Sequence, residues 1–179
     1  ADPTVTRGAY CVTTLGMAGA YSTIANGGTK RTPTGVEKVI DQRGDTIYEA
    51  DTEGTRVLSP EVAHAATEVM KGVVTGGTGT GARLASGQVA AGKTVTSENY
   101  RDSYFCGITP QLSVAIWLGN RQERAVGSDC TSVFRDFVGN ALKDQPLEEF
   151  PEADDPPYKP SYEVNFNSSE LGYSYNYNY

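Results

Sequence analysis

The chain has 179 residues, of which 38% are hydrophobic and 21% charged, and this composition is typical of a globular chain with a real core. No run of apolar residues approaches the ~18 that a membrane helix needs, and no signal-peptide pattern opens the chain. The formal net charge of −7 argues against nucleic acid or anionic lipid as the main partner, and one histidine with three cysteines excludes a His-rich or four-cysteine metal site.

Three elements are predicted in the first half of the chain. A hydroxyl cap at Thr14, apolar residues at helical spacing and the closing Asn26-Gly27-Gly28 predict a helix over residues 14–28. Two β-prone segments around 41–45 predict a hairpin over residues 34–49. A second helix should start at Ser59 and Pro60, with one apolar face made of Val62, Ala65, Ala66, Val69, Met70 and Val73.

The second half predicts a sheet and a closing helix. The glycine-rich residues 75–82 follow a helix and lack the ending of a phosphate loop, which indicates a flexible connector. Strands are predicted at 88–97, 103–109 and 112–119, and their sequential order suggests an antiparallel meander. An amphipathic helix over 132–142 should pack on this sheet. Separate blocks of helices and strands predict an α+β fold, an antiparallel sheet covered by helices.

The end of the chain differs from the rest. Residues 145–179 hold seven acidic residues, one lysine and five prolines, and they finish in the tyrosine-rich segment 173–179. So acidic and proline-rich a segment buries too little apolar surface to fold alone, although its tyrosines can pack as anchors. We therefore expect a body of residues 1–144 and an acidic Pro/Tyr-rich tail of residues 145–179, without regular structure, lying along the body or a partner.

The order of these blocks resembles a known family. The relevant segments are Thr14–Gly28, Thr78–Ala82, Ala91-Gly92-Lys93-Thr94-Val95-Thr96-Ser97, Asp102–Phe105, Gly107–Leu112 and Phe134–Phe137. Together they cover about residues 10–143, and they resemble the C-terminal part of the transpeptidase domain of bacterial class A (bifunctional) penicillin-binding proteins. The resemblance implies part of a fold similar to penicillin-binding proteins and serine β-lactamases.

The resemblance also implies a reaction and a set of site residues. In the family, a serine of a Ser-x-x-Lys motif is acylated by a stem peptide ending in D-Ala-D-Ala, a second stem amine then cross-links peptidoglycan, and β-lactams trap the serine. Lys93 would supply positive charge and the Thr96 backbone N–H half of an oxyanion hole, as catalytic groups. Thr94, Val95 and Thr96 would line the substrate site, with both threonine hydroxyls on the substrate carboxylate. The resemblance implies no cofactor and no metal. The alternative to a functional role is that Lys93 is a solvated lysine on an ordinary strand.

The sequence departs from the family pattern in two ways. Neither Ser-x-x-Lys nor Ser-x-Asn occurs where the family requires it, so the chain should be inactive alone and should need the missing N-terminal half of the domain as a partner. The family's Lys-Thr-Gly is here Lys93-Thr94-Val95. Because glycine allows close approach of a ligand or helix to the strand, we expect Val95 to narrow or fill the cleft.

Two cysteines suggest a cross-link if the protein is exported. Cys106 lies in a predicted strand and Cys130 lies just before the closing helix. A disulfide between them would stabilise the fold by ~3 kcal/mol, with Cys11 left over, and the alternative is two buried free thiols.

The main hypothesis is thus a fragment of a peptidoglycan D,D-transpeptidase on the outer side of the cytoplasmic membrane in the bacterial cell envelope. Its ligands would be a stem peptide or a β-lactam, bound by the full domain. The rival is a non-enzymatic, degenerate transpeptidase-like surface module whose acidic, tyrosine-rich tail engages a partner. A related serine β-lactamase or carboxypeptidase is a third option, which the blocks 107–112 and 134–137 favour less.

Overall fold

A three-stranded antiparallel sheet forms the centre of the molecule, which is known from a computed structural model that describes residues 11–157 except 123 and 128. Its strands are β5 (Ala91–Thr96), β6 (Asp102–Ile108) and β7 (Ser113–Gly119), in the order β5-β6-β7. The register runs without interruption from the pair Ala91↔Ile108 to the pair Thr96↔Ser103. The predicted α+β meander is confirmed.

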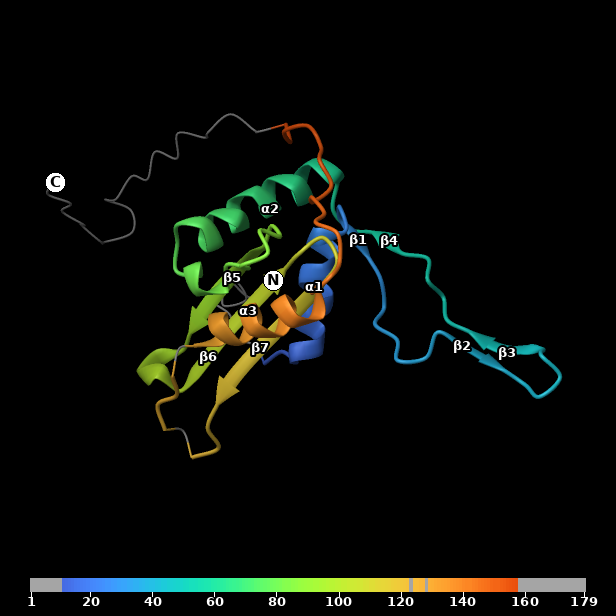
Figure 1. The fold of residues 1–179 in the computed structure, drawn as a ribbon, viewed down its shortest axis with the longest axis horizontal. Helices are drawn as coiled ribbons and strands as arrows, with labels where there is room; N and C mark the ends of the chain where they lie inside the picture. Colours follow the sequence, from blue (N-terminus) through green and yellow to red (C-terminus); the bar gives the residue numbers. More distant parts are fainter. Residues whose placement is uncertain (1–10, 123, 128, 158–179) are drawn as a thin grey trace, which may run out of the picture.

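Helices cover both faces of this sheet (Figure 1). Helix α1 (Thr14–Ala25) packs on β6 and β7, where the Ser113 hydroxyl donates to the Ala18 carbonyl oxygen at 2.7 Å. Helix α3 (Cys130–Ala141) packs on the other face, where the Phe134 and Phe105 rings meet edge to face with centroids 5.1 Å apart. Side chains alternate along a strand, so each strand residue belongs to one face or the other. We call these the α1 face and the α3 face.

Helix α2 (Pro60–Thr75) packs against β5 and begins as predicted, because the Ser59 side chain accepts a hydrogen bond from the Val62 amide. Its predicted apolar face is confirmed only in part, because Met70 packs against the core whereas Val62 and Val69 are exposed. The buried residues are Ala63, Thr67 and Val74, whereas Val69 is 76% exposed. Thr67 can be buried because its hydroxyl donates to the Ala63 carbonyl at 2.9 Å, so a polar residue lies on the packed side of the helix.

A hairpin projects from the body, as Figure 1 shows. Its base is formed by β1 (Thr29–Lys30) and β4 (Thr55–Arg56), and its outer part by β2 (Lys38–Ile40) and β3 (Thr46–Glu49). The Asp41 carboxylate closes the turn by accepting from the amides of Arg43 and Asp45. The predicted hairpin is therefore confirmed, and every residue of β2 and β3 is exposed.

The cap of α1 is Thr13 rather than the predicted Thr14, since the Thr13 hydroxyl accepts a hydrogen bond from the Gly16 amide.

Two glycines turn the chain from the end of α1 into this hairpin. Gly27 and Gly28 have φ of 60° and 91°, a backbone conformation that favours glycine. A side chain at Gly28 would also overlap the backbone of Leu58, so this turn depends on a bare backbone.

The first part of the predicted tail lies along the body. We call residues 145–151 the strap, which has no helix or strand. The Gln88 side chain donates to the Glu148 carbonyl at 2.8 Å and accepts from the Glu148 amide at 3.0 Å. Phe150 is buried against Ala25, Ala91 and Ile108. The strap thus fixes the chain after α3 to the residues that lead into β5.

Short 3₁₀ turns complete the described structure, at Thr80–Ala82 and Glu98–Tyr100. Within the described ranges, no helix is both long and apolar enough to cross a membrane. The tyrosine-rich end of the predicted tail lies outside the described residues.

Candidate active-site wall

Strand β5 carries the predicted site residues at one side of the sheet. Among the described strands it pairs with β6 alone, so its other edge has no strand beside it. Lys93, Val95 and Thr96 are exposed, and Thr94 is half-buried. The structure therefore presents this segment as an accessible strand edge.

The four residues divide between the two faces of the sheet. Lys93 lies across from Cys106 and Val95 across from Tyr104, on the α1 face. Thr94 and Thr96 lie across from Phe105 and Ser103, on the α3 face. The lysine and the two hydroxyls are thus neighbours along one edge, although their side chains leave the strand in opposite directions.

Two of these side chains already have hydrogen-bond partners. The Lys93 ammonium donates to the Thr94 carbonyl oxygen at 2.7 Å. The Thr94 and Thr78 hydroxyls are 2.5 Å apart, so the glycine-rich connector after α2 is tied to β5. A substrate carboxylate would have to share or replace these bonds.

An apolar groove of about 670 Å³ runs along the α1 face beside Val95. We call it the α1 groove. Its lining comes from the start of α1 and from the sheet: Cys11, Val12, Thr13, Thr14, Met17, Tyr21, Val95, Asp102, Tyr104, Cys106 and Trp117. Val12, Val95 and Trp117 are each 50–58% exposed, which is unusual for such apolar side chains gathered at one place.

Most ionisable groups of the α1 groove favour their neutral forms. Burial and, second, the Cys130 thiol raise the pKa of Cys106 to about 11. Burial and the nearby Cys106 thiol raise the pKa of Tyr21, and burial, Cys106 and Asp102 raise the pKa of Tyr104. A groove with an apolar, largely uncharged lining is suited to packing rather than to acid–base chemistry.

Asp102 joins the three strands at the open end of this groove. One carboxylate oxygen accepts from the Trp117 indole N–H at 2.9 Å. The other accepts from the Ser97 hydroxyl at 3.0 Å, and that hydroxyl accepts from the Asp102 amide at 2.7 Å. These contacts were missed by sequence reasoning, and the available signal was the meander itself, since Asp102 and Trp117 come from adjacent strands.

The predicted disulfide between Cys106 and Cys130 is not formed, and both residues are buried free thiols. Cys130 lies on the α3 face, where its thiol is 3.3 Å from the carbonyl oxygen of Ser103. Cys106 is three residues after Ser103 on the same strand, so its side chain lies on the α1 face and lines the α1 groove. The strand itself separates the two sulfur atoms.

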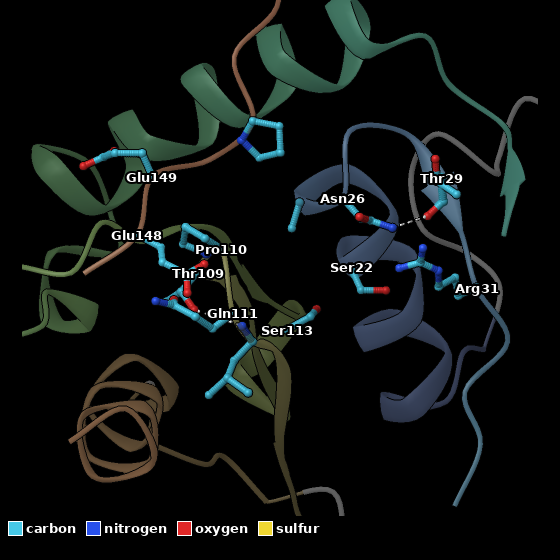
Figure 2. A pocket seen from close by; sticks show the side chains of 13 residues that line it. Ser22, Asn26, Thr29, Arg31, Thr109, Pro110, Gln111, Ser113, Glu148 and Glu149 are labelled. Atoms are coloured by element: carbon cyan, nitrogen blue, oxygen red, sulfur yellow. Dashed lines mark hydrogen bonds between the residues drawn. The ribbon is translucent and has the colours of Figure 1, made fainter. Parts of the chain in front are cut away.

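A second cavity, of about 370 Å³, lies at the other end of the sheet (Figure 2). It is enclosed by the C-terminal part of α1, the turn 109–112 and the strap, and it is lined by polar residues that include Ser22, Asn26, Arg31 and Gln111. None of the predicted site residues lines it. The cavity therefore lies apart from the predicted residues of β5, and β5 remains the candidate site.

Residues 4–139 match the family described as the penicillin binding protein transpeptidase domain, and the chain belongs to that family. The match covers the sheet, the helices and the β5 segment.

The relatives are class A proteins. Penicillin-binding protein 1A of Clostridium novyi is 34% identical over 139 residues, which is 76% of this chain and 16% of the relative. Penicillin-binding protein 1A of Clostridium acetobutylicum is 39% identical over 110 residues, 61% of this chain and 14% of the relative. The chain therefore spans well under a quarter of the length of these curated relatives.

Solved structures agree with the sequence comparisons. The penicillin-binding protein PonA1 from Mycobacterium tuberculosis superposes with a TM-score of 0.74 and 27% identity, over 85% of this chain and 44% of that one. PonA1 in complex with penicillin V gives the same values. The chain thus has the fold of part of a transpeptidase domain.

Proposed function

We propose that the chain forms the substrate-gripping wall of a D,D-transpeptidase active site. The supporting observation is the exposed edge of β5, on which Lys93, Thr94 and Thr96 follow one another in a member of this family. A lysine and two hydroxyls at one strand edge can hold the carboxylate of a stem peptide or a β-lactam. Thr96 would add its backbone N–H to an oxyanion hole.

The chain alone should not form a covalent acyl-enzyme. Acylation needs an activated serine, and no Ser-x-x-Lys occurs in the 179 residues. A fluorescent penicillin should label a complete transpeptidase domain that contains this chain, and should leave the 179-residue chain unlabelled on a denaturing gel. If neither protein is labelled, the proposed function is contradicted. If the isolated 179-residue chain is labelled, the inference that the acylated serine lies outside it is contradicted.

The α1 groove is proposed as the seat of the preceding part of the domain. Support comes from the half-exposed Val12, Val95 and Trp117, which a folded protein normally covers. Trp117 is the only tryptophan in the chain, so its fluorescence reports on the groove. Adding the preceding part of the domain as a separate polypeptide should shift the Trp117 emission to the blue, and an unchanged spectrum would contradict this seat.

The proposed location is the bacterial cell envelope, outside the cytoplasmic membrane, as expected for relatives that are penicillin-binding proteins 1A. Ile47 is 66% exposed on the outer hairpin, away from the α1 groove that Cys11 lines, and it provides a test. A membrane-impermeant maleimide added to intact cells should modify Ile47→Cys, while the buried Cys106 and Cys130 stay unmodified until the protein is denatured. Absence of labelling at residue 47 in cells whose outer layers are permeable to the reagent would contradict the location.

The second candidate is a non-enzymatic module with a degenerate site. Val95 favours it, because a branched side chain stands where the family pattern has glycine. Under this alternative a complete domain would stay unlabelled by penicillin even when residue 95 is changed to glycine. Labelling restored by Val95→Gly would favour the enzyme.

A further inference from the structure

The position of Thr96 depends on how β5 ends. Thr96 is the last residue of the strand and forms the last pair with β6, opposite Ser103. The turn that follows contains two residues other than glycine with left-handed backbones, Asn99 at φ 59° and Tyr100 at φ 56°. Such backbones cost free energy and persist only where surrounding contacts impose them. The strand end therefore needs a restraint.

Ser97 and Asp102 supply a restraint at the first step beyond the last strand pair. The Ser97 amide donates to the Asp102 carbonyl at 3.0 Å, and the Asp102 amide donates to the Ser97 hydroxyl at 2.7 Å. The Ser97 hydroxyl in turn donates to the Asp102 carboxylate at 3.0 Å. Three hydrogen bonds thus connect Ser97 and Asp102 and close the turn, one between backbone groups and two that involve side chains.

The same carboxylate also reaches the third strand. The Trp117 indole N–H donates to Asp102 at 2.9 Å. The indole lies over Gly119, where a side chain would overlap the ring, so the bare backbone at residue 119 lets the ring reach Asp102. Asp102 is thus held between β5 and β7, and motion of the strand end would have to break charge-assisted hydrogen bonds.

From this arrangement we propose that Asp102 is a positioning residue for the substrate grip on β5. Its carboxylate holds Ser97, and through Ser97 it fixes the backbone N–H and hydroxyl of Thr96. The inference rests on the proposed function, since it assigns a task to the same strand edge. Its physical basis is that oxyanion donors act when they are held in place beforehand, and misplacement by about 1 Å can cost ~100-fold in rate.

Thr94 is held separately, from the opposite side. Its hydroxyl meets Thr78 of the connector rather than any residue of the Asp102 group. Loss of Asp102 should therefore loosen Thr96 much more than Thr94. A general unfolding of the sheet would loosen both, so the comparison separates positioning from stability.

The first experiment measures backbone order in the 179-residue chain by ¹⁵N relaxation. The order parameter of the Thr96 amide should fall from about 0.85 to about 0.6 in Asp102→Ala and Ser97→Ala, with little change at Thr94. Ser97→Thr keeps the hydroxyl and should restore the value. Asp136→Ala is the control, because that carboxylate is exposed on α3 and pairs with Arg135. Unchanged order at Thr96 in Asp102→Ala would overturn the proposal.

The second experiment measures penicillin acylation in a complete domain that contains the chain. Asp102→Ala and Ser97→Ala should slow acylation at least tenfold at temperatures well below unfolding, while Ser97→Thr and Asp136→Ala stay within twofold of the parent. Loosened Thr96 with an unchanged acylation rate would overturn the positioning role. A parent domain that is never acylated, with valine or glycine at residue 95, would contradict the proposed function instead, and the relaxation data alone would then decide whether Asp102 holds the strand.

Discussion

Val95 is the residue at which the sequence departs from the Lys-Thr-Gly pattern, and it is exposed on the α1 face. Its side chain is 54% exposed and lines the α1 groove next to the edge of β5. A glycine there would leave the backbone accessible from that face, whereas valine fills the space with two methyl groups. Val95 pairs with Tyr104 of β6, so the space that valine fills is confined to this part of the sheet.

We predict that Val95→Gly speeds penicillin acylation of a complete domain. Relief of a steric overlap of about 1–3 kcal/mol corresponds to roughly 5- to 150-fold in the acylation rate constant. The variant should also lose about 0.5–1 kcal/mol of stability, since glycine weakens a strand. Stopped-flow acylation and urea unfolding measure the two effects, and Val95→Ala should lie between parent and glycine variant. An acylation rate that does not change would show that Val95 leaves the cleft open.

Cys106 predicts a dependence of stability on alkaline pH. Its pKa is raised to about 11 from an ordinary value of 9.0, so the folded protein binds the thiol proton more tightly than the unfolded chain. The stabilisation is complete below pH 9 and is lost as the pH rises toward 11, and each tenfold difference in proton affinity between the two states corresponds to about 1.4 kcal/mol. Urea unfolding from pH 8 to 11 should therefore show a steeper fall for the parent than for Cys106→Ala. Parallel curves would contradict the raised pKa of Cys106. Tyr21 and Tyr104, whose pKa values are raised mainly by burial, contribute to the fall in both proteins, and Cys106→Ala removes only the smaller contribution of the neighbouring thiol to these two pKa values.

At the scale of the elements, the strap behaves as part of the body. Phe150 is 7% exposed and contacts Ala91 at the start of β5, and Gln88 bonds both backbone groups of Glu148. A buried aromatic ring and a fully paired amide are both costly to remove.

We predict that Phe150→Ala lowers the free energy of unfolding by about 2–4 kcal/mol, which urea titration would measure. Leu147→Ala is the matched control, because Leu147 lies in the same strap and is 61% exposed, and its effect should stay below about 0.5 kcal/mol. Equal, small effects for the two variants would mean that the strap does not contribute to the core.

The hairpin of β2 and β3 is the opposite case. All of its strand residues are exposed, and its Lys38–Glu49 ion pair at 3.5 Å is a surface pair of small value. Since an isolated two-stranded hairpin is marginally stable in water, it should open independently of the body.

Hydrogen exchange should therefore find the amides of 38–49 exchanging at least 100-fold faster than those of β6. Replacing residues 38–49 with a short glycine-serine loop should leave the melting temperature of the body within about 2 °C. A melting temperature that falls further would show that the hairpin packs on the body in solution.

Local sequence patterns predicted the helices and strands better than they predicted the contacts between them. The meander, the hairpin and the start of α2 follow from turn residues, caps and alternation, and these were confirmed. The buried face of α2 was predicted only in part, because the hydrogen bond of Thr67 to its own helix lets a polar residue be buried. The cysteine pairing failed because sequence spacing does not reveal which face of β6 each sulfur occupies. The contacts of Gln88 and Phe150 join distant residues and had no local signal, whereas those of Asp102 could have been found only from the meander, which brings Ser97 and Trp117 beside it.

At the scale of the whole molecule, the net negative charge and the α1 groove belong to different parts of the sequence. Six of the seven net negative charges belong to residues 145–179, whereas the α1 groove is lined mainly by apolar and neutral side chains. The groove should therefore bind apolar probes in spite of the acidic character of the protein.

We predict that the isolated chain enhances the fluorescence of the dye ANS while fully folded. Val12→Ser together with Val95→Ser should reduce the enhancement by at least half, since both valines line the groove. Val133→Ser, at an exposed valine on α3, is the control and should change it little. An equal loss of dye fluorescence in the double variant and in Val133→Ser would show that the dye binds outside the α1 groove.

The two hydrogen bonds between Gln88 and Glu148 limit how far the chain can be shortened from its C-terminal end. A truncation at the end of α3 would leave the buried Gln88 amide with neither strap partner, and the site of Phe150 beside Ala91 would be open to water. We therefore expect a truncation series to lose soluble expression abruptly when its endpoint passes Phe150.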